Sequence, residues 1–254
     1  MPYAIVVRAL TLGFCLAPLC AAWAQDASQT QEKPDEQIVF AENFEEVAET
    51  DNWNGGERWQ ARVDPACDTV FAVDKDYGKE GKGLEIRNTR TSEEHRCKWA
   101  VLSRSLEEVK GQEQFTVSFS YFVPSAKAPH RGRVDFNMTD PKGGFMFFIE
   151  LGPTAVAFIC AKDQAGKYQY ARHNVKPAEW HTLNIEVDQK AQKFRVHVDG
   201  ELVKADWGEW AICRNPRPLS PDRPKSIHFQ AAHNWPSSVR RIDDIIVTVP
   251  VQTP

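Results

Sequence analysis

Alternating polar residues on short segments are the groups in this sequence that could bind a ligand or carry out chemistry. In the segment RVDFNM, Arg133, Asp135 and Asn137 alternate with apolar residues. Because successive side chains of a β-strand point to opposite faces, these three side chains share a face. We predict that they line one groove on one sheet together with similarly spaced residues of other segments. Those residues are Glu150, Tyr168, Tyr170, His228 and Gln230.

The same residues could support two kinds of catalysis. Hydrolysis of a glycoside needs two placed carboxylates, and Asp135 and Glu150 each stand alone on their segments, so they could pair only across a sheet. Elimination by a lyase needs a base such as Tyr or His, and an Arg, Gln or Asn that neutralises a uronate. Tyr170, His228 and Arg133 are residues of these types. The alternative is that the polar face only meets water.

Other chemistries lack their motifs. The sequence has no Gly-x-Ser-x-Gly, and its seven histidines include no His-Glu-x-x-His pair, so neither a serine nucleophile nor a catalytic zinc is predicted. The chain has 31 basic and 35 acidic residues and a formal net charge of −4. An acidic protein without a basic stripe is a poor candidate for binding nucleic acid, because that affinity comes largely from neutralising phosphates.

Tryptophans in loop-like segments could supply the stacking surface that a sugar ring needs. Trp207, Trp210 and Trp235 lie in such segments, and an aromatic face can stack on a sugar ring. We predict that one of them stands at the rim of the groove, and the alternative is that they cover the edge of a sheet. Trp53 and Trp59 lie beside strand patterns and are predicted to belong to the core.

The first residues have the features of a secretory signal peptide. Arg8 precedes an apolar run, and the tripeptide that ends at Ala24 has alanine at its first and third positions, so we predict cleavage after Ala24. Residues 25–37 are polar and predict a disordered leader. The protein is therefore expected to be secreted or periplasmic. No later segment is long and apolar enough for a membrane span.

The cysteines agree with an oxidising compartment. Two of the six cysteines lie in the predicted signal peptide, and the remaining four allow three pairings. We favour Cys67–Cys97 and Cys160–Cys213, because each bond then closes a separate region. The rival interpretation is a metal site, for which the sequence offers no Cys-x-x-Cys pair.

The elements that must position these residues are short strands separated by turns. The clearest case is WHTLNIEVDQKAQKFRVHVDGELV, in which Leu183, Ile185 and Val187 alternate with polar residues before a turn and a second alternating run. Similar runs continue through the chain, and strong helical periodicity is nearly absent. Strands of this kind bury one side by packing two sheets face to face. We predict one all-β domain over residues 38–250, an antiparallel β-sandwich of two sheets of the jelly-roll kind.

Three stretches resemble laminin-G-like and concanavalin A-like jelly rolls. WHTLNIEVDQKAQKFRVHVDGELV resembles their paired strands, RRIDDIIVTV their last strand and VFAENFE their first strand. The resemblance spans roughly residues 38–250 and implies a two-sheet sandwich. The superfamily includes lectins, carbohydrate-binding modules, glycoside hydrolases, polysaccharide lyases and adhesion modules, so the fold alone does not decide the function.

The resemblance also implies a calcium ion between the first and last strands, because such jelly rolls often hold one with oxygen ligands there. Glu42, Glu45 and Asp243 lie in these two segments, and Asp244 follows directly. The alternative is that they are scattered surface acids. No other cofactor is predicted.

These observations favour a secreted or periplasmic jelly-roll protein that binds a polysaccharide or another glycan without catalysis. One alternative is a diverged polysaccharide lyase or glycoside hydrolase that uses the same sheet face. The hydrolase motif Glu-x-Asp-x-x-Glu and the lyase motif Arg-x-Glu-x-Arg are both absent from the sequence. The other alternative is an adhesion module that binds proteins.

Overall fold

The computed structural model of the chain describes residues 35–64, 67–88, 100–124, 134–140, 144–162, 167–205, 208–213, 221–231 and 238–251. At 134–135, 137, 140, 144–146, 159–162, 231 and 238 it describes the backbone only. The described residues belong to one compact unit that runs from Pro34 to Pro254. Within them the regular elements are β-strands, with a single short 3₁₀ helix, η1 (Glu107–Val109), and no α-helix.

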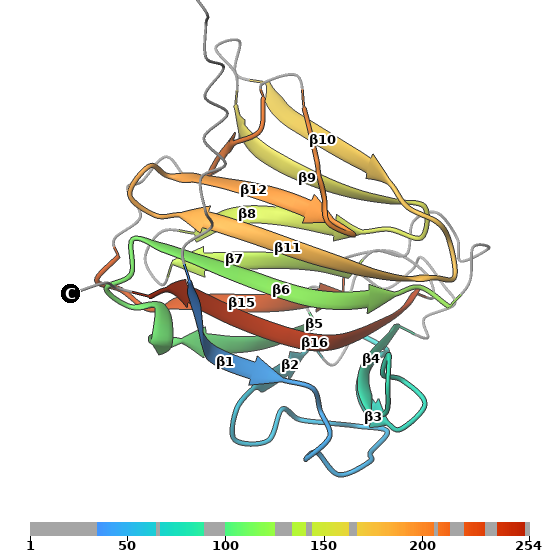
Figure 1. Cartoon of the computed structure of the whole chain (residues 1–254). Helices are drawn as coiled ribbons and strands as arrows, with labels where there is room; N and C mark the ends of the chain where they lie inside the picture. Colours follow the sequence, from blue (N-terminus) through green and yellow to red (C-terminus); the bar gives the residue numbers. More distant parts are fainter. Residues whose placement is uncertain are drawn as a thin grey trace, which may run out of the picture. The chain divides into compact units, whose positions relative to one another are not determined.

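The strands form two antiparallel sheets, which pack as the two layers of a sandwich (Figure 1). This confirms the predicted all-β, two-sheet fold. The nine-stranded sheet A has the order β13-β12-β11-β6-β16-β4-β3, with β1 paired to β16 and β14 paired to β12. Its strands are β1 (Glu36–Glu42), β3 (Thr69–Asp74), β4 (Gly83–Asn88), β6 (Gln114–Phe122), β11 (Trp180–Asp188), β12 (Lys193–Val198), β13 (Glu201–Leu202), β14 (Ala211–Ile212) and β16 (Ser238–Pro250).

The seven-stranded sheet B has the order β10-β9-β8-β7-β15-β5-β2. Its central strands come from the middle and from the end of the chain, so residues far apart in sequence become neighbours. Its strands are β2 (Gln60–Val63), β5 (Ala100–Leu106), β7 (Val134–Asp140), β8 (Gly144–Leu151), β9 (Ala155–Lys162), β10 (Tyr168–Asn174) and β15 (Lys225–Ala231).

The core lies between the sheets and is rich in phenylalanine. Phe119 of β6 in sheet A contacts Phe136 of β7 and Phe229 of β15 in sheet B, with ring centroids 4.7 and 5.3 Å apart. All three side chains are at most 1% exposed. Rings of this size bury a large apolar area, which makes them a major source of core stability. Their positions fix which side of each strand faces inward.

The alternating segment with which the sequence predicted this fold forms the hairpin β11–β12. Leu183, Ile185 and Val187 are buried, and the polar residues between them face outward. The chain then turns from β12 to β13 at Asp199 and Gly200, whose φ angles are 52° and 82°. Positive φ at both central residues is typical of the tight hairpin turns that Asp-Gly favours.

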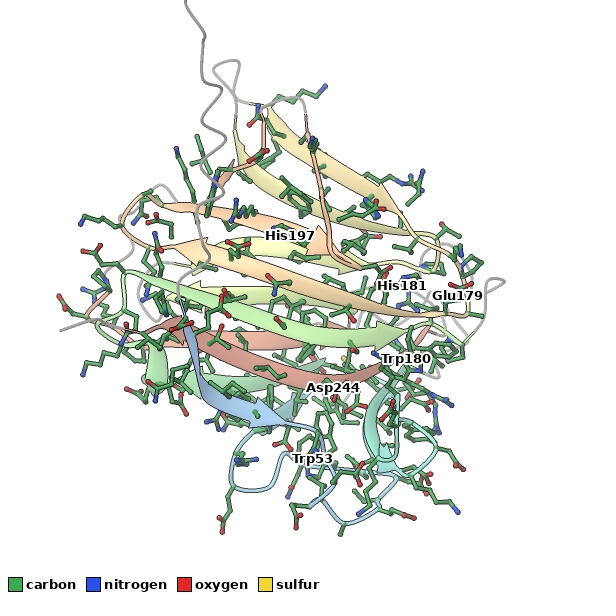
Figure 2. The ribbon with its side chains drawn as sticks, viewed as in Figure 1. Trp53, Glu179, Trp180, His181, His197 and Asp244 are labelled. Atoms are coloured by element: carbon green, nitrogen blue, oxygen red, sulfur yellow. The ribbon has the colours of Figure 1, made fainter. Side chains whose placement is uncertain are left out.

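His181 explains the Trp-His opening of this segment. Its side chain is almost fully buried. Nδ1 lies 2.7 Å from Oδ2 of Asp199 in the turn, and Nε2 lies 2.7 Å from the backbone oxygen of Lys176. Figure 2 shows His181 beside Trp180 and Glu179 at one end of β11. Because a carboxylate and a carbonyl oxygen are both acceptors, the ring satisfies both contacts when both nitrogens carry a proton.

We predict that His181→Ala destabilises the protein by about 2–3 kcal/mol, because it removes two hydrogen bonds and a buried ring that packs against Tyr121, with ring centroids 5.6 Å apart. Lys176→Ala is the matched control. It keeps the backbone oxygen and removes only an exposed ion pair with Glu179, whose N–O distance is 3.8 Å, so it should change stability little. Urea unfolding measures both, and equal losses for the two variants would contradict this role of His181.

Strand β1 starts at Glu36, two residues before the predicted start of the domain. Glu36 is the register partner of Pro250 at the end of β16, and the N–H of Val251 donates to the backbone oxygen of Asp35 (2.7 Å). Pairing with the last strand thus holds the end of the polar segment. The predicted signal peptide lies outside the described residues. None of the helical turns in the described ranges is long and apolar enough to cross a membrane.

A β-bulge divides β16 into two halves. Between Asp243 and Ile246 the strand advances by three residues, while its partner β6 advances by two, from Ser120 to Ser118. Asp244 takes a φ of 51° at this point. The extra residue lets Ile242 on one side of the bulge and Ile245 on the other both reach the core.

Two of the four cysteines outside the predicted signal peptide, Cys67 and Cys213, have described side chains. Cys67 is disulfide-bonded, whereas its predicted partner Cys97 lies outside the described residues, so this pairing stays a prediction. Cys213 is a free, buried thiol, so the predicted Cys160–Cys213 bond is wrong. The side chain of Cys213 packs in the hydrophobic core, where it behaves as a small apolar residue.

We expect iodoacetamide to leave Cys213 unmodified in the native protein and to alkylate it in the denatured protein. Burial raises the pKa of this thiol to about 12, and the thiolate is the reactive form. Mass spectrometry of the peptide that contains Cys213 measures the modification, with Cys213→Ser as the blank. Resistance of this peptide to alkylation in denaturant without reductant would indicate a disulfide and contradict the free thiol.

Candidate functional site

The predicted groove residues fall into two adjacent rows across the outward side of sheet B. In the first row, Gln230 of β15 is the register partner of Asp135 of β7, which is also the partner of Glu150 of β8. The row continues through Ala157 of β9 to Arg172 of β10. Residues from five strands are thus aligned in one row, in which positions 135 and 150 are direct register partners.

The second row begins at His228 of β15. Its register partner is Asn137 of β7, followed by Phe148 of β8, Ile159 of β9 and Tyr170 of β10. Tyr168 pairs with Lys162 beyond a register shift in β10. Strand neighbours of these positions, such as Phe136 and Phe229, are buried in the core. The two rows therefore lie on the opposite side of the sheet from the core.

His228 is held as a neutral ring in the second row. Its Nε2 lies 2.8 Å from Oγ1 of Thr139 on the neighbouring strand. Burial and, to a lesser extent, the positive charge of Arg62 together lower the pKa of His228 to about 4. At neutral pH the ring is therefore uncharged and has one donor and one acceptor nitrogen. It can form hydrogen bonds with a neutral ligand or accept a proton.

Among the described side chains of this face, Tyr170 is the aromatic one that is open to solvent. Its side chain is 62% exposed, and it lies on β10 at the edge of sheet B. A tyrosine ring in this position presents an apolar face and a polar tip to a ligand. Tyr168, two residues earlier on the same strand, is half-buried.

The remaining groove residues divide into two groups. Arg133, Trp207 and Trp235 lie outside the described residues, so their places in the groove stay predictions. Trp210 lies with the other sheet, because the guanidinium carbon of Arg195 on β12 is 4.7 Å from the centre of its ring. Its contact with Arg195 of sheet A therefore keeps Trp210 away from the two rows of sheet B.

Polar side chains on the outward side of the β11–β12 hairpin in sheet A bind one another or the neighbouring strand β6. Glu186 forms an ion pair with Arg195 (2.6 Å), and its other carboxylate oxygen lies 3.0 Å from Nε2 of His197. The amide nitrogen of Asn184 donates to Ser118 (3.0 Å). These contacts lie across neighbouring strands, where opposite charges stabilise a sheet. We infer that this face supports the fold.

Acidic residues gather in a hollow at the β16 bulge. The cavity has a volume of about 370 Å³. Asp244, which lines it, is labelled in Figure 2 and marks its position. Oδ2 of Asp243 accepts the backbone N–H of Lys79 (2.8 Å), and Oε1 of Glu45 accepts that of Lys82 (2.8 Å). The lining consists of Asn43, Glu45, Lys79, Glu80, Asp243 and Asp244.

Only part of the predicted calcium set meets in this hollow. Glu45 and Asp243 line it, whereas Glu42 turns into the protein and forms an ion pair with Arg58 (3.3 Å). Glu42 is therefore removed from the set. In the described part of the chain, no three His, Cys, Asp or Glu residues are arranged to hold a metal. The two carboxylates of the set that meet here supply only part of the about six to eight oxygen ligands that Ca²⁺ takes. Calcium binding stays a prediction.

Asp243 should make stability depend on pH in a way that Asp243→Asn removes. Its pKa is raised from 3.8 to about 6, chiefly by burial and also by the charges of Asp244 and Glu45, although the backbone N–H groups of Lys79 and Asp244 act in the opposite direction. Since the folded state holds the proton more tightly than the unfolded state, this group destabilises the protein as pH rises from about 4 to about 6. The unfolding free energy of the variant, relative to the wild type, should therefore rise over this range. Thermal unfolding at several pH values measures it, and a pH-independent difference would contradict the shift.

Comparisons with known proteins show the fold and no family. No protein-family model matches the sequence, and no curated protein matches it. A carbohydrate esterase from the Shiga toxin-encoding bacteriophage phi24B has a TM-score of 0.55 and 14% identity, over 85% of this chain and 99% of the esterase. A sialidase has a TM-score of 0.55 and 12% identity, over 80% of this chain and 18% of its own.

A third similar structure is the binding domain of botulinum neurotoxin serotype D, with a TM-score of 0.50 and 11% identity, over 85% of this chain and 49% of that one. The chain thus spans about a fifth of the sialidase and about half of the toxin domain. At these identities the likeness concerns the fold, a jelly-roll-like all-β sandwich.

Proposed function

We propose that this protein is an exported, non-catalytic glycan-binding module, and that the outward side of sheet B is its binding face. The observation that carries the proposal is the alignment of polar and aromatic positions from β15, β7, β8, β9 and β10 in two rows. We also place the chain in the concanavalin A-like branch of jelly rolls, on its Trp-His, Asp-Gly and Ile-Asp-Asp stretches.

The dimensions of the two rows suit an extended ligand. Neighbouring strands lie about 4.8 Å apart, so the four steps from β15 to β10 span about 19 Å. An oligosaccharide laid across the strands would meet Gln230 at one end of the first row and Arg172 at the other. Its hydroxyl groups can both donate and accept hydrogen bonds, so they match amide, carboxylate and neutral imidazole groups.

Tyr170 gives this face an anchor. An exposed ring at the end of a row can stack against one sugar, while hydrogen bonds from the remaining positions fix the orientation of the chain. Because the ring is exposed before binding, the contact removes apolar surface from water at no cost to the core. Tyr170 is therefore the residue whose loss should reduce affinity most.

We predict that Tyr170→Ala weakens binding at least about tenfold, which corresponds to about 1.4 kcal/mol. A glycan array identifies a ligand, and isothermal titration calorimetry with that glycan measures the affinity. Asn184→Ala is the matched control, because it removes a polar outward side chain from the other sheet. Equal binding by the wild type and Tyr170→Ala, or equal losses in both variants, would contradict this site.

A hydrolase is the second candidate function, because positions 135 and 150 are direct register partners. Opposed residues of antiparallel strands have Cβ atoms about 4.5–5.5 Å apart, and retaining glycosidases hold their two carboxyl groups about 5–5.5 Å apart. The neutral His228 and the exposed Tyr170 would suit a lyase instead. An adhesion module that binds proteins is the third candidate.

Product formation separates these candidates. Under the proposal, incubation with the polysaccharide found on the array releases neither reducing ends nor unsaturated uronate. Release of reducing ends that Glu150→Gln abolishes would replace the binding module with a hydrolase. Release of unsaturated uronate that Tyr170→Phe abolishes would replace it with a lyase. An empty array with a captured protein partner would favour the adhesion module.

A further inference from the structure

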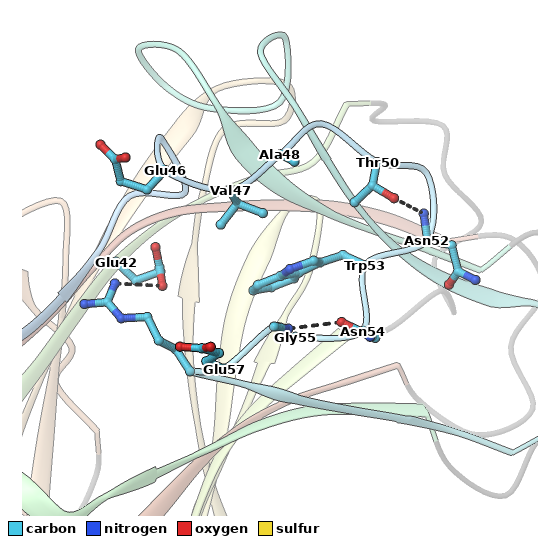
Figure 3. A pocket seen from close by; sticks show the side chains of 12 residues that line it. Glu42, Glu46, Val47, Ala48, Thr50, Asn52, Trp53, Asn54, Gly55 and Glu57 are labelled. Carbon is cyan, nitrogen blue, oxygen red and sulfur yellow. Dashed lines mark hydrogen bonds and ion pairs between the residues drawn. The ribbon is translucent and has the colours of Figure 1, made fainter.

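A pocket lies where the chain crosses from β1 to β2, away from the rows of sheet B. Its volume is about 490 Å³, which lies within the range of about 300–1,000 Å³ that is typical of ligand pockets. Figure 3 shows the ring of Trp53 reaching into it, between the segment of Val47 and the segment of Gly55 and Glu57. The pocket thus has an aromatic floor between two loop segments.

The Trp53 ring is held firmly and keeps one donor free. It packs edge-on against Phe44, with ring centroids 5.7 Å apart and planes at 86°. The backbone N–H of Trp53 also donates to the backbone oxygen of Phe71 (2.6 Å). The side chain is only 8% exposed, yet its Nε1–H has no hydrogen-bond partner among the described residues. A donor that opens on the pocket without a protein acceptor can donate to an atom of a ligand there.

The loop beside Trp53 is also fixed in place. A Cβ atom on Gly55 would lie 2.4 Å from the backbone oxygen of Trp59, and the φ angle of Gly55 is 100°. Only glycine therefore fits this position. Nearby, the buried Glu42 accepts from Arg58 and from Nε1 of Trp59, both at 3.3 Å. The pocket wall is thus set before any ligand arrives, which reduces the entropic cost of binding.

The polar groups around the ring favour a neutral ligand with many hydroxyl groups. The exposed carboxylates of Glu46 and Glu57 form no ion pair within the described structure and can accept from hydroxyls. The Asn52 amide group takes no part in a hydrogen bond there and can both donate and accept. Three carboxylates, counting Glu42, against one arginine disfavour an anionic ligand.

We propose that this pocket, which we call the Trp53 pocket, is a second binding site and that it takes a neutral sugar unit. A hydroxyl or ring oxygen of the sugar accepts from the Trp53 indole N–H, its apolar side lies against the part of the ring that opens on the pocket, and its other hydroxyls reach lining groups such as Glu57. The site uses no residue of the sheet B rows, so it stands or falls separately from the proposed binding face.

The indole N–H signal of Trp53 in a ¹H–¹⁵N NMR spectrum tests the proposal, and Trp53→Phe assigns this signal by its disappearance. The probes are D-glucose, D-galactose, D-mannose and D-xylose, each added to about 10 mM, at which a site with a Kd of about 1 mM is mostly filled. At least one of them should shift the signal. D-glucuronate should not shift it, because the carboxylates of the pocket repel its charge.

A pair of exposed carboxylates supplies the matched variants. Glu57→Gln should raise the Kd for the sugar by about tenfold, the loss expected for one charge-assisted hydrogen bond. Glu49→Gln changes a carboxylate of the same region that does not line the pocket, and it should leave the Kd unchanged. Tyr170→Ala should leave the Trp53 signal and its shift unchanged as well.

Three results would overturn the proposal. The first is no shift of the Trp53 signal with any of the four neutral sugars. The second is a shift with tetramethylammonium alone, which would mark a cation site. The third is an equal effect of Glu57→Gln and Glu49→Gln. If Trp53→Phe fails to fold, sequential assignment of the wild-type signal and the two glutamate variants still give the answer.

Discussion

Three phenylalanines between the sheets determine what the protein presents to its surroundings. Phe119 of sheet A contacts Phe136 and Phe229 of sheet B, and the rings of the latter two lie 5.1 Å apart. Because neighbours along a strand point to opposite sides, burying Phe136 turns positions 135 and 137 outward. Burying Phe229 does the same for His228 and Gln230. The two polar rows are therefore a direct consequence of aromatic packing in the core.

The two outward faces of the sandwich use polar residues differently. On sheet A, the carboxylate of Glu186 forms an ion pair with Arg195 and lies 3.0 Å from Nε2 of His197, so the charge of Arg195 is compensated inside the protein. Sheet B combines an exposed tyrosine, a neutral histidine and two carboxylate positions in register. Paired opposite charges stabilise a sheet. An aromatic ring that stays exposed to water adds little to the stability of the fold but is available for contact with a ligand.

Alternation along single segments was enough to predict the fold class and the outward side chains. It depends on local geometry alone. Which strands become neighbours depends on long-range packing, so the sequence could not show that 135 faces 150 or that Trp210 stacks on Arg195. Glu42 illustrates a missed signal: it follows the buried Phe40 by two residues, so alternation directs it inward and away from the acidic hollow. Trp53 belongs to the core as predicted, but its role in a pocket depends on loops that carry no periodic pattern.

The bulge in β16 adds one residue to the strand and thereby shifts the alternation between inward and outward side chains by one position. Before it, even-numbered residues such as Arg240 and Ile242 are buried; after it, odd-numbered residues such as Ile245 and Val247 are buried. A regular strand that kept Asp244 without the bulge would continue the even-numbered phase and exchange inside for outside along the rest of the strand. Thr248 would then face the core in place of Val247. A single residue with a left-handed backbone therefore keeps the last strand of the protein in phase with its sheet.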